Sequence, residues 1–382
     1  MPEFVPGLEL SRQFYTNAVR PILEGDFPGL AHAAALIGSG SEVLGFDTEM
    51  SRDHCWGPRV DLFVREEDHA RWAERVRAAL GEKLPLEFGG YPTHFQPYAG
   101  EPGTLILAPA ADRPIRHQVQ VLTVSGFLRE YAGLEAGREL TLLDWLAIPE
   151  QKLRTLAKGA VYYDGLGSLE ALQRRLAWYP RDLWLYLLSA QWQRIGQEEP
   201  FVGRSGGAGD EAGSAVIAAR LARDVMRLFL LMARQYAPYS KWFGGAFARL
   251  PCAPRVTPIL ERAARAAEWQ ERQRCLADAY EIAAVAHNDL GITPPVPTQA
   301  RAFYDRPFLV IGGEEIARRI GDAIQDPLVR ALPFGVGKVD QFVDSTDVLS
   351  HDRRCRAVMG EIAGPGSCRG TGSGAALNAV TG

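Results

Sequence analysis

A Gly-Ser-Gly turn followed closely by acidic residues stands in one short stretch, GSGSEVLGFDTEMSRDHC, at residues 38–55. Glycine lets the backbone approach a ligand without obstruction by a Cβ atom, so the amides of such a turn can hold phosphate oxygens. Carboxylates two residues apart on an extended segment point the same way and can share one divalent metal ion. The spacing therefore predicts a site for a phosphate and a metal ion.

The candidate residues for this chemistry form two groups. The nucleotide-binding candidates are the residues of the turn, Gly38, Ser39, Gly40 and Ser41. The candidates for catalysis and metal binding are the carboxylates Asp47, Glu49 and Asp53, with Asp61 as a further metal ligand. Asp47 and Glu49 are two residues apart and make one possible pair.

The segments around this stretch have the patterns of a small α/β domain. Residues 8–37 read as one or two helices, with LAHAAALIG as the helix that ends at the turn. RVDLFV, residues 59–64, alternates like a strand, and residues 66–84 have the period of an amphipathic helix. TLILAP and HQVQVLTV read as two more strands. We therefore predict an α+β protein whose N-terminal α/β domain, residues 1–136, contains a mixed sheet.

The pattern changes after GLEAGREL, where long helical periods replace alternation. The predicted helices cover residues 168–195, 211–236 and 255–288. They indicate a mainly α-helical domain over residues 137–350, with a small strand-containing segment near 306–324. We expect residues 351–382 to be a flexible tail, because the last part is rich in Gly and Ser and lacks large apolar residues.

Two groups in the predicted helical domain are candidates for substrate contacts. FVGRSGGAGDEAGS reads as a Gly-rich loop, and Arg204, Asp210 and Glu211 lie on or beside it. Acidic residues there suit the start of the next helix, whose dipole favours negative charge. YAPYSKW places Tyr239 near Lys241, and the Lys241 ammonium is a candidate for binding a triphosphate.

Composition excludes several classes of function. The 382 residues include 42 basic and 46 acidic side chains, so the net charge of −4 supplies no field for nonspecific binding of a long nucleic acid. The five cysteines are scattered and form no CxxC pair, which favours free thiols over a zinc site. The N-terminus lacks the pattern of a signal peptide and no apolar run is long enough to cross a bilayer. We expect a cytoplasmic protein with no membrane partner.

Residues 38–64 resemble the Gly-Ser motif and acidic segment of the DNA polymerase beta-like nucleotidyltransferase superfamily. The resemblance is closest to a bacterial branch called domain of unknown function 4037, and residues 179–206, 236–244 and 339–349 also look like that branch. It implies a nucleotidyltransferase fold followed by a helical domain. It also implies transfer of a nucleoside monophosphate from a nucleoside triphosphate, with Mg²⁺ or Mn²⁺ as cofactor, to a small-molecule or macromolecular acceptor that the family does not name.

Carried over by residue, Gly38 and Ser39 match the phosphate turn, Asp53 matches the first acid, and Cys55 falls where the second acid would be. A neutral thiol is a poor ligand for hard Mg²⁺. Three explanations stay open: a degenerate enzyme, an alternative carboxylate pair, or a family that never used the second acid. HQVQVLTV also lacks the third acid that is usual on a later strand of the superfamily. The rival functions are therefore a nucleotide-binding pseudoenzyme that has lost metal chemistry and an antitoxin-like interaction protein.

Overall fold

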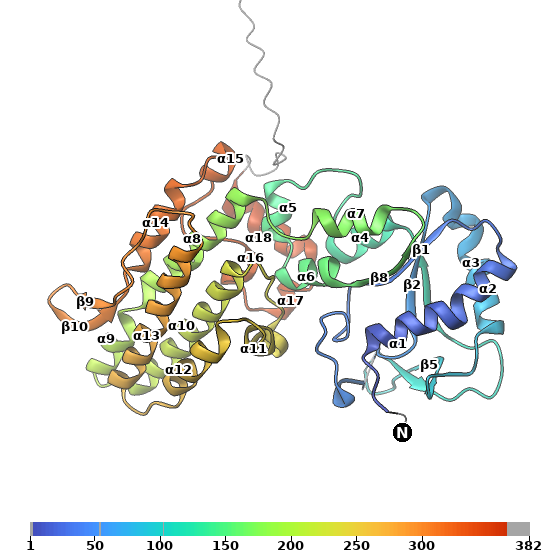
Figure 1. Ribbon diagram of the computed structural model, residues 1–382, viewed down its shortest axis with the longest axis horizontal. Helices are drawn as coiled ribbons and strands as arrows, with labels where there is room; N and C mark the ends of the chain where they lie inside the picture. The colour runs from blue at the N-terminus through green and yellow to red at the C-terminus, as the bar shows by residue number, and fades with distance from the viewer. Residues whose placement is uncertain (1–2, 53–54, 102, 365–382) are drawn as a thin grey trace, which may run out of the picture. The chain divides into compact units, whose positions relative to one another are not determined.

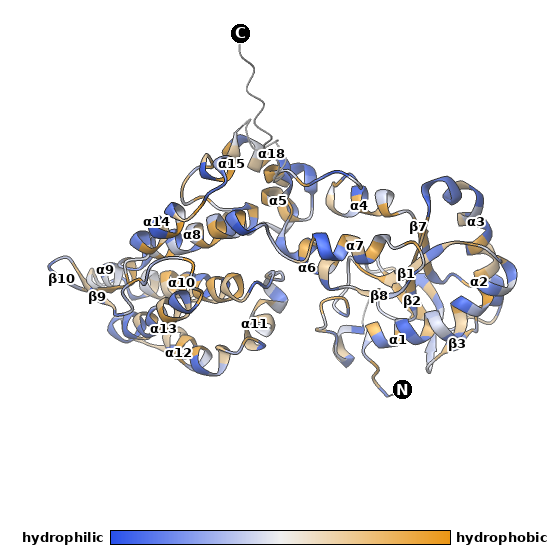
Figure 2. Cartoon of the chain, turned by 45° about the horizontal axis from the view of Figure 1, so that its top comes forward, coloured by the Kyte–Doolittle hydropathy of each residue, from blue (hydrophilic) through white to orange (hydrophobic). Residues whose placement is uncertain are grey.

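The computed structural model describes residues 3–52, 55–101 and 103–364 (Figure 1). Most of the chain is helical, with a mixed four-stranded sheet in the N-terminal half. Hydrophilic and hydrophobic stretches lie side by side along the helices of Figure 2, as expected of helices that bury one face. The predicted α+β class is confirmed. None of the described helices is long and apolar enough to span a membrane.

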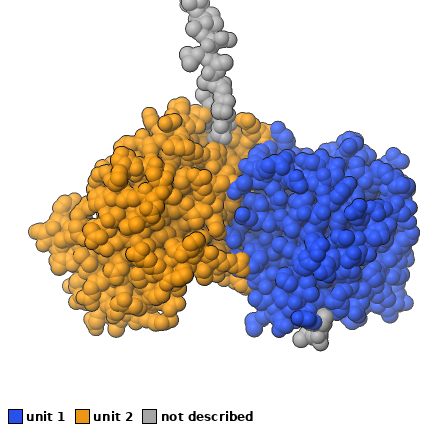
Figure 3. Space-filling view, viewed as in Figure 1, with its two compact units in different colours: residues 1–137, 151–177 blue, residues 138–150, 178–382 orange. Residues whose placement is uncertain are grey.

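The chain divides into two compact units, coloured separately in Figure 3. Unit 1 contains residues 1–137 and 151–177, and unit 2 contains residues 138–150 with the described chain from 178 onward. The sequence pattern assigns 151–177 to the helical domain, but the structure places this segment in unit 1. The reason is a non-local strand pairing, because β8 (Ala160–Asp164) completes the sheet beside β1 (His32–Leu36).

The sheet of unit 1 has the strand order β7–β2–β1–β8. Strand β2 (Arg59–Val64) is antiparallel to β1 and parallel to β7 (Gln118–Leu122), whereas β8 is antiparallel to β1. The sheet is therefore mixed, as predicted. Two small hairpins accompany it, formed by β3 (Glu87–Phe88) with β4 (Tyr91–Pro92) and by β5 (His94–Pro97) with β6 (Leu105–Ala108).

The prediction of a helix in LAHAAALIG is wrong, because His32–Leu36 forms the strand β1. All five residues are buried, and β1 has a partner strand on each side. A short, fully buried apolar run has no distinctive period, and the helix propensity of alanine is a weak preference that tertiary pairing overrides. Small side chains suit this central position because both faces of the sheet are covered by packed side chains.

Helices cover the two faces of the sheet. One face packs against α1 (Gly7–Phe14), the π-helical turn Tyr15–Val19, α2 (Arg20–Asp26) and α3 (Glu66–Lys83). The other face packs against side chains of α4 (Val124–Ala132) and α7 (Ser168–Arg175). The predicted strand 59–64 and amphipathic helix 66–84 are both present. The charged positions of β2 lie on the face covered by α4.

Unit 2 is mainly helical, as predicted. Its longer helices are α8 (Arg181–Glu198), α10 (Glu211–Met232), α12 (Ala253–Arg265) and α13 (Trp269–Asp289). Shorter helices are α5 (Leu142–Ala147), α9 (Phe201–Gly207), α11 (Ser240–Ala248), α15 (Pro327–Arg330), α16 (Val339–Phe342), α17 (Thr346–Leu349) and α18 (Asp352–Ala363). The expected strand-containing segment is a hairpin of β9 (Arg301–Phe303) and β10 (Arg306–Val310) followed by α14 (Gly313–Asp322).

Two segments of unit 2 differ from the sequence-based expectation. Residues 201–207 form the helix α9 instead of a loop, and its glycines allow close packing: a Cβ atom on Gly206 would lie 2.2 Å from the Trp269 side chain. Residues 352–363 form α18 instead of the start of a flexible tail. Cys355 and Met359, one turn apart on α18, are both buried, so this helix has an apolar face that the polar residues around it conceal in the sequence.

Candidate functional site

The Gly-Ser-Gly turn lies at one edge of the sheet in unit 1. It follows β1 directly, at the end of the sheet where β1 stops and β2, β7 and β8 begin. The expected helix before the turn is therefore replaced by a buried strand. Gly38 is buried, Ser39 is exposed, and the backbone N–H of Phe46 donates to the carbonyl of Ser41 to close the loop that follows. The turn is thus held at the end of a rigid element and presents Ser39 to solvent.

The two glycines of the turn have conformations that other residues rarely adopt. The φ angle is +88° at Gly38 and +146° at Gly40. A Cβ atom on Gly40 would also lie 2.5 Å from Nη2 of Arg59 and 2.7 Å from Oε2 of Glu42. Gly40 is therefore required both by the backbone conformation and by an ion pair packed against it.

This ion pair joins Arg59, the first residue of β2, to the buried side chain of Glu42. Arg59 Nε donates to Glu42 Oε1 over 2.9 Å, and Arg59 Nη2 donates to the carbonyl oxygen of Ser39 over 2.7 Å. Burial lowers the pKa of Arg59, but the charges of Glu42 and Asp61 outweigh this and raise the pKa above its usual value. Arg59 is thus a permanent cation that fixes the turn.

Sequence reasoning did not identify Arg59 and Glu42 as site residues. Alternation along β2 places Arg59, Asp61 and Phe63 on one face and Val60 on the other, so the signal was present in RVDLFV. A strand that directs charged residues toward a face covered by a helix is unusual, because buried charges need partners.

Asp61 is the predicted acid that the structure brings to the turn. It pairs in register with Ala35 of β1, and its Oδ2 accepts a hydrogen bond from the backbone N–H of Ile37 over 3.4 Å. Burial raises the pKa of Asp61 from 3.8 to about 6, while Arg59 and the Ile37 hydrogen bond partly oppose this rise. On the other side, β7 places the neutral amide Gln120 beside Asp61. Asp61 therefore changes protonation close to neutral pH.

The other acidic candidates have different surroundings. Asp47 Oδ2 accepts hydrogen bonds from Gly7 N over 2.6 Å and from Trp56 Nε1 over 3.1 Å, so its carboxylate joins the start of α1 to the segment before β2. Glu49 is exposed at the start of a 3₁₀ turn, Glu49–Arg52. The Asp47 carboxylate is thus occupied by two protein donors, and the Glu49 side chain is exposed to solvent.

Asp53 lies outside the described residues, so its role as a metal ligand stays a prediction. Cys55 is exposed and has a φ of +51°, and its backbone N–H donates to the carbonyl of Leu105 over 2.8 Å. Within residues 3–52, 55–101 and 103–364, no group of three His, Cys, Asp or Glu side chains is arranged to hold a metal ion. Among the predicted metal ligands that the structure describes, Asp61 is the one bonded to the residue before the turn.

The predicted substrate residues near 201–214 make structural contacts in unit 2. Asp210 caps α10 by accepting a hydrogen bond from Gly213 N over 2.7 Å. Glu211 Oε2 accepts from Nη1 of the buried Arg272 over 2.9 Å. The Arg204 guanidinium lies 5.4 Å from the ring centre of Phe201. These contacts explain the three residues without a ligand.

The remaining candidates lie at the start of α11. Tyr239 is exposed and immediately precedes this helix. Lys241 is exposed, with its Nζ 4.9 Å from the ring centre of Trp242. Both residues belong to unit 2, whereas the glycine turn belongs to unit 1.

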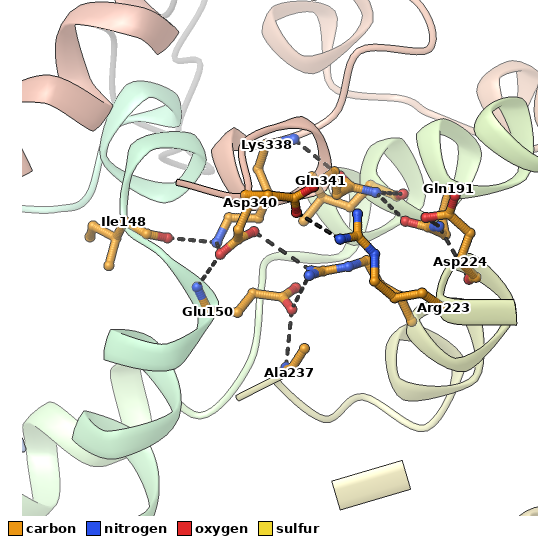
Figure 4. A network of polar contacts seen from close by, with 12 residues as sticks. Ile148, Glu150, Gln191, Arg223, Asp224, Ala237, Lys338, Asp340 and Gln341 are labelled. Atoms are coloured by element: carbon orange, nitrogen blue, oxygen red, sulfur yellow. Dashed lines mark hydrogen bonds and ion pairs between the residues drawn. The ribbon is translucent and has the colours of Figure 1, made fainter. Parts of the chain in front are cut away.

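A buried network of charges in unit 2 has no counterpart in the sequence analysis (Figure 4). Lys338 is completely buried, and its Nζ donates to the carbonyl oxygen of Ile148 over 2.6 Å. The backbone N–H of Glu150 donates to Asp340 Oδ2. Burial lowers the pKa of Lys338, and the charges of Asp340 and Glu150 oppose this shift. Lys338 is therefore a buried side chain whose Nζ lies 3.7 Å from the carboxylate of Asp340.

Glu150 is the centre of the same network. Its Oε2 accepts from Arg227 Nη1 over 3.1 Å and from Ala237 N over 3.0 Å, and its Oε1 accepts from the Tyr179 hydroxyl over 3.2 Å. Burial, with the nearby charge of Asp340, raises the pKa of Glu150. These groups are buried and bond to one another, so the network holds segments of unit 2 together and is the arrangement expected of a structural element.

Comparison with known proteins gives a family for part of the chain. Residues 145–243 match the family described as Domain of unknown function (DUF4037). The resemblance to this DUF4037 family is thereby confirmed over that range, which includes Glu150, Tyr179, Arg227 and Ala237 of the buried network. A crystal structure of a nucleotidyltransferase-like protein from Exiguobacterium sibiricum is similar with a TM-score of 0.32 and 9% identity, over 74% of this chain and 78% of that chain. No curated protein matches the chain at a significant level.

Proposed function

We propose that the protein is a metal-dependent nucleotidyltransferase that moves a nucleoside monophosphate from a nucleoside triphosphate to an acceptor hydroxyl or similar group. The observation that carries this proposal is the position of the Gly38–Gly40 turn, which follows a buried strand and lies beside the acid Asp61 of the neighbouring strand. The resemblance of residues 38–64 to the Gly-Ser motif and acidic segment of the superfamily supports the same reading.

The turn supplies the phosphate-binding groups in this proposal. Its amides can donate to phosphate oxygens because glycine leaves the backbone uncovered. Arg59 keeps the turn in place through the Ser39 carbonyl and the Glu42 carboxylate, so the donors are held in position before the ligand arrives. A pre-organised site loses less conformational entropy on binding.

Mg²⁺ or Mn²⁺ is the proposed cofactor, held by Asp61 together with Asp53, and it would offset the charge of the phosphates. Asp61 binds a cation only as a carboxylate, so a proton competes with the metal for this residue. Because the pKa of Asp61 is about 6, the apparent affinity for the metal should increase as pH rises through this value. Asp53 lies outside the described residues, so we derive no step through the metal.

The reaction balances as a displacement at phosphorus. The acceptor oxygen forms a bond to the α-phosphorus, the bond from that phosphorus to the β-phosphate bridging oxygen breaks, and pyrophosphate leaves while the acceptor loses its proton. In this scheme the turn holds the phosphates so that the acceptor meets the α-phosphorus in line, which is a contribution of position.

A nucleotide-binding pseudoenzyme is the second candidate, favoured by two observations. Cys55 replaces the second acid of the motif, and Gln120 stands beside Asp61 where an acidic side chain would provide another ligand. Both side chains are weaker ligands for a hard cation than carboxylates.

Calorimetric titration with ATP, with and without Mg²⁺, tests these candidates. Binding that strengthens with Mg²⁺, together with transfer of label from α-labelled ATP to an acceptor mixture, supports the nucleotidyltransferase. Binding that is indifferent to Mg²⁺ and produces no labelled product favours the pseudoenzyme. The absence of ATP binding under both conditions contradicts both.

A further inference from the structure

A group of hydroxyls borders the glycine turn on the side of α4 and α6 (Glu150–Lys158). The Tyr131 hydroxyl hydrogen-bonds to Thr155 Oγ1 over 2.7 Å and also to the side chain of the exposed Ser39. Burial raises the pKa of Tyr131, and these two hydrogen bonds oppose the rise. The turn is therefore connected by side chains to a helix more than a hundred residues away in sequence.

The Tyr131 ring contacts one side chain from α4 and one from α6. Phe127 stacks on it with ring centres 5.5 Å apart and an angle of 5° between the planes. Lys152 places its Nζ 5.6 Å from the ring centre of Tyr131, within the range of a cation–π contact. The aromatic pair approaches the turn closely, since a Cβ atom on Gly38 would lie 3.2 Å from Phe127 and 3.6 Å from Tyr131. The ammonium is thereby held near the turn.

The segment that carries these groups is itself anchored to the turn. Thr155 Oγ1 donates to the carbonyl oxygen of Lys152, which links the two residues along α6. At the end of the helix, a Cβ atom on Gly159 would lie 2.4 Å from the Ile37 side chain, so the chain is in close contact with the residue that precedes the turn. Residues 151–177 of unit 1 therefore add β8 to the sheet and also pack against the end of β1 beside the turn.

The chemistry of this group matches a polyphosphate. The turn offers backbone N–H donors, Ser39 offers a hydroxyl donor, and Lys152 offers a cationic donor, whereas the Tyr131 proton is used in the bond to Thr155 and its ring positions the other groups. Among the described residues, Arg59, which is bonded to Glu42, and Asp61 are also charged side chains at this end of the sheet. Phosphate oxygens accept hydrogen bonds and carry negative charge, so they satisfy ammonium and hydroxyl donors together.

We infer that Lys152, with Ser39 and Tyr131, forms a polyphosphate subsite beside the glycine turn and that Lys152 is the cation that binds the terminal phosphates of a nucleoside triphosphate. This inference rests on the proposed function and gives Lys152 the role that the sequence pattern suggests for Lys241. Lys152 is suited to this role because it belongs to the same unit as the turn and is already positioned against Tyr131.

Binding of ATP, tripolyphosphate and adenosine to purified full-length variants tests the subsite. Lys152→Gln should weaken the binding of ATP and of tripolyphosphate by roughly tenfold or more, because it removes a hydrogen bond between charged groups. The affinity for adenosine should not change. Lys152→Arg should restore most of the loss. Tyr131→Phe should weaken the binding of the two phosphate ligands by a smaller factor. It removes the hydrogen bond between the Tyr131 hydroxyl and Ser39 but keeps the ring stacked on Phe127.

Lys158→Gln is the matched control. Lys158 is an exposed lysine on the same helix, six residues after Lys152 and therefore about 240° around the helix axis. The Lys158→Gln variant should bind both phosphate ligands with dissociation constants within about twofold of those of the parent. Melting temperatures of all variants show whether each one is folded.

The possible outcomes separate this inference from the proposed function. Equal binding of ATP by the parent and Lys152→Gln overturns the subsite and leaves the proposed function standing. A loss of ATP affinity in Lys241→Gln, together with unchanged ATP affinity in Lys152→Gln, also overturns the subsite. A parent that binds neither ATP nor tripolyphosphate contradicts the proposed function and the subsite together.

Discussion

Replacing Lys338 by methionine should strongly destabilise unit 2. The substitution keeps an unbranched side chain of similar length but removes the buried ammonium. The Ile148 carbonyl then loses its donor, and the carboxylates of Glu150 and Asp340 keep Arg227 as their remaining cation. Two buried acids that share one guanidinium are less well compensated than in the parent.

The size of the effect follows from burial. Lys338 has no exposed surface, and the side chains of both acids are less than a tenth exposed. Removing one partner of a buried ion pair costs about 3–5 kcal/mol because a charge is left without compensation. This is a large part of the roughly 5–15 kcal/mol by which proteins of this kind are stable. Lys241→Met, which removes an exposed lysine of the same unit, should change stability by no more than about 0.5 kcal/mol.

The cost of Lys338→Met should also depend on pH. The folded-state pKa of Glu150 is raised above its unfolded value, so the stability linked to its neutral form is present below the unfolded pKa and is lost as pH rises through the folded pKa. Without the ammonium, the folded-state pKa of Glu150 rises further. The variant should therefore lose less stability, relative to the parent, at about pH 5 than at about pH 8.

Urea unfolding followed by tryptophan fluorescence measures this prediction, with parent, Lys338→Met and Lys241→Met compared at both pH values. A cost below about 1 kcal/mol, or one that is the same at both pH values, would refute the reasoning, because it would mean that the acids do not depend on a buried cation.

Three further predictions concern unit 1. Burial raises the pKa of Asp61 from 3.8 to about 6, so stability linked to its neutral form is complete below 3.8 and lost as pH rises through about 6. The free energy of unfolding of Asp61→Asn, measured in urea, should therefore rise relative to that of the parent by up to about 3 kcal/mol between about pH 4 and pH 8. A difference in unfolding free energy that stays constant with pH would contradict this. Asp47→Ala removes the acceptor of Gly7 N and Trp56 Nε1 and should cost about 1–3 kcal/mol without altering the Mg²⁺ dependence of ATP binding in calorimetry. A changed Mg²⁺ dependence would return Asp47 to the metal site. Cys55→Asp, at a φ of +51° that aspartate tolerates, should melt at a lower temperature than the parent in chelator and gain more from millimolar Mg²⁺. Equal shifts for both proteins would place position 55 away from the metal.

The parts of the fold that the sequence predicts are those with a local period. Residues 59–64 alternate and residues 66–84 repeat with a helical period, and both patterns give the observed elements. His32–Leu36 has no such pattern, because a central strand buried on both faces needs no alternation. Alanine-rich composition then favours a helix, and the pairing of β1 with β2 and β8 decides otherwise.

The site was predictable to the extent that its residues are adjacent in sequence. The glycine turn and Asp61 could be identified from residue type and spacing, whereas Glu42 becomes a site residue only through its bond to Arg59. Contacts over long separations have no local signal: Lys338 and Ile148 are 190 residues apart, and Tyr131 and Thr155 meet only because residues 151–177 join unit 1. The buried charges of unit 2 therefore leave no sign in the local sequence pattern.

The binding of phosphate by the glycine turn is the central claim, and amide hydrogen exchange measures it most directly. Exchange should be followed in peptides that cover residues 37–41, with the helix α3 as an internal reference and adenosine as a ligand control. Saturating ATP with Mg²⁺ should slow exchange at the turn, because amides that donate to phosphate oxygens are protected, and should leave α3 unchanged. Adenosine should produce no protection at the turn. Exchange at residues 37–41 that is the same with and without saturating ATP would contradict the claim.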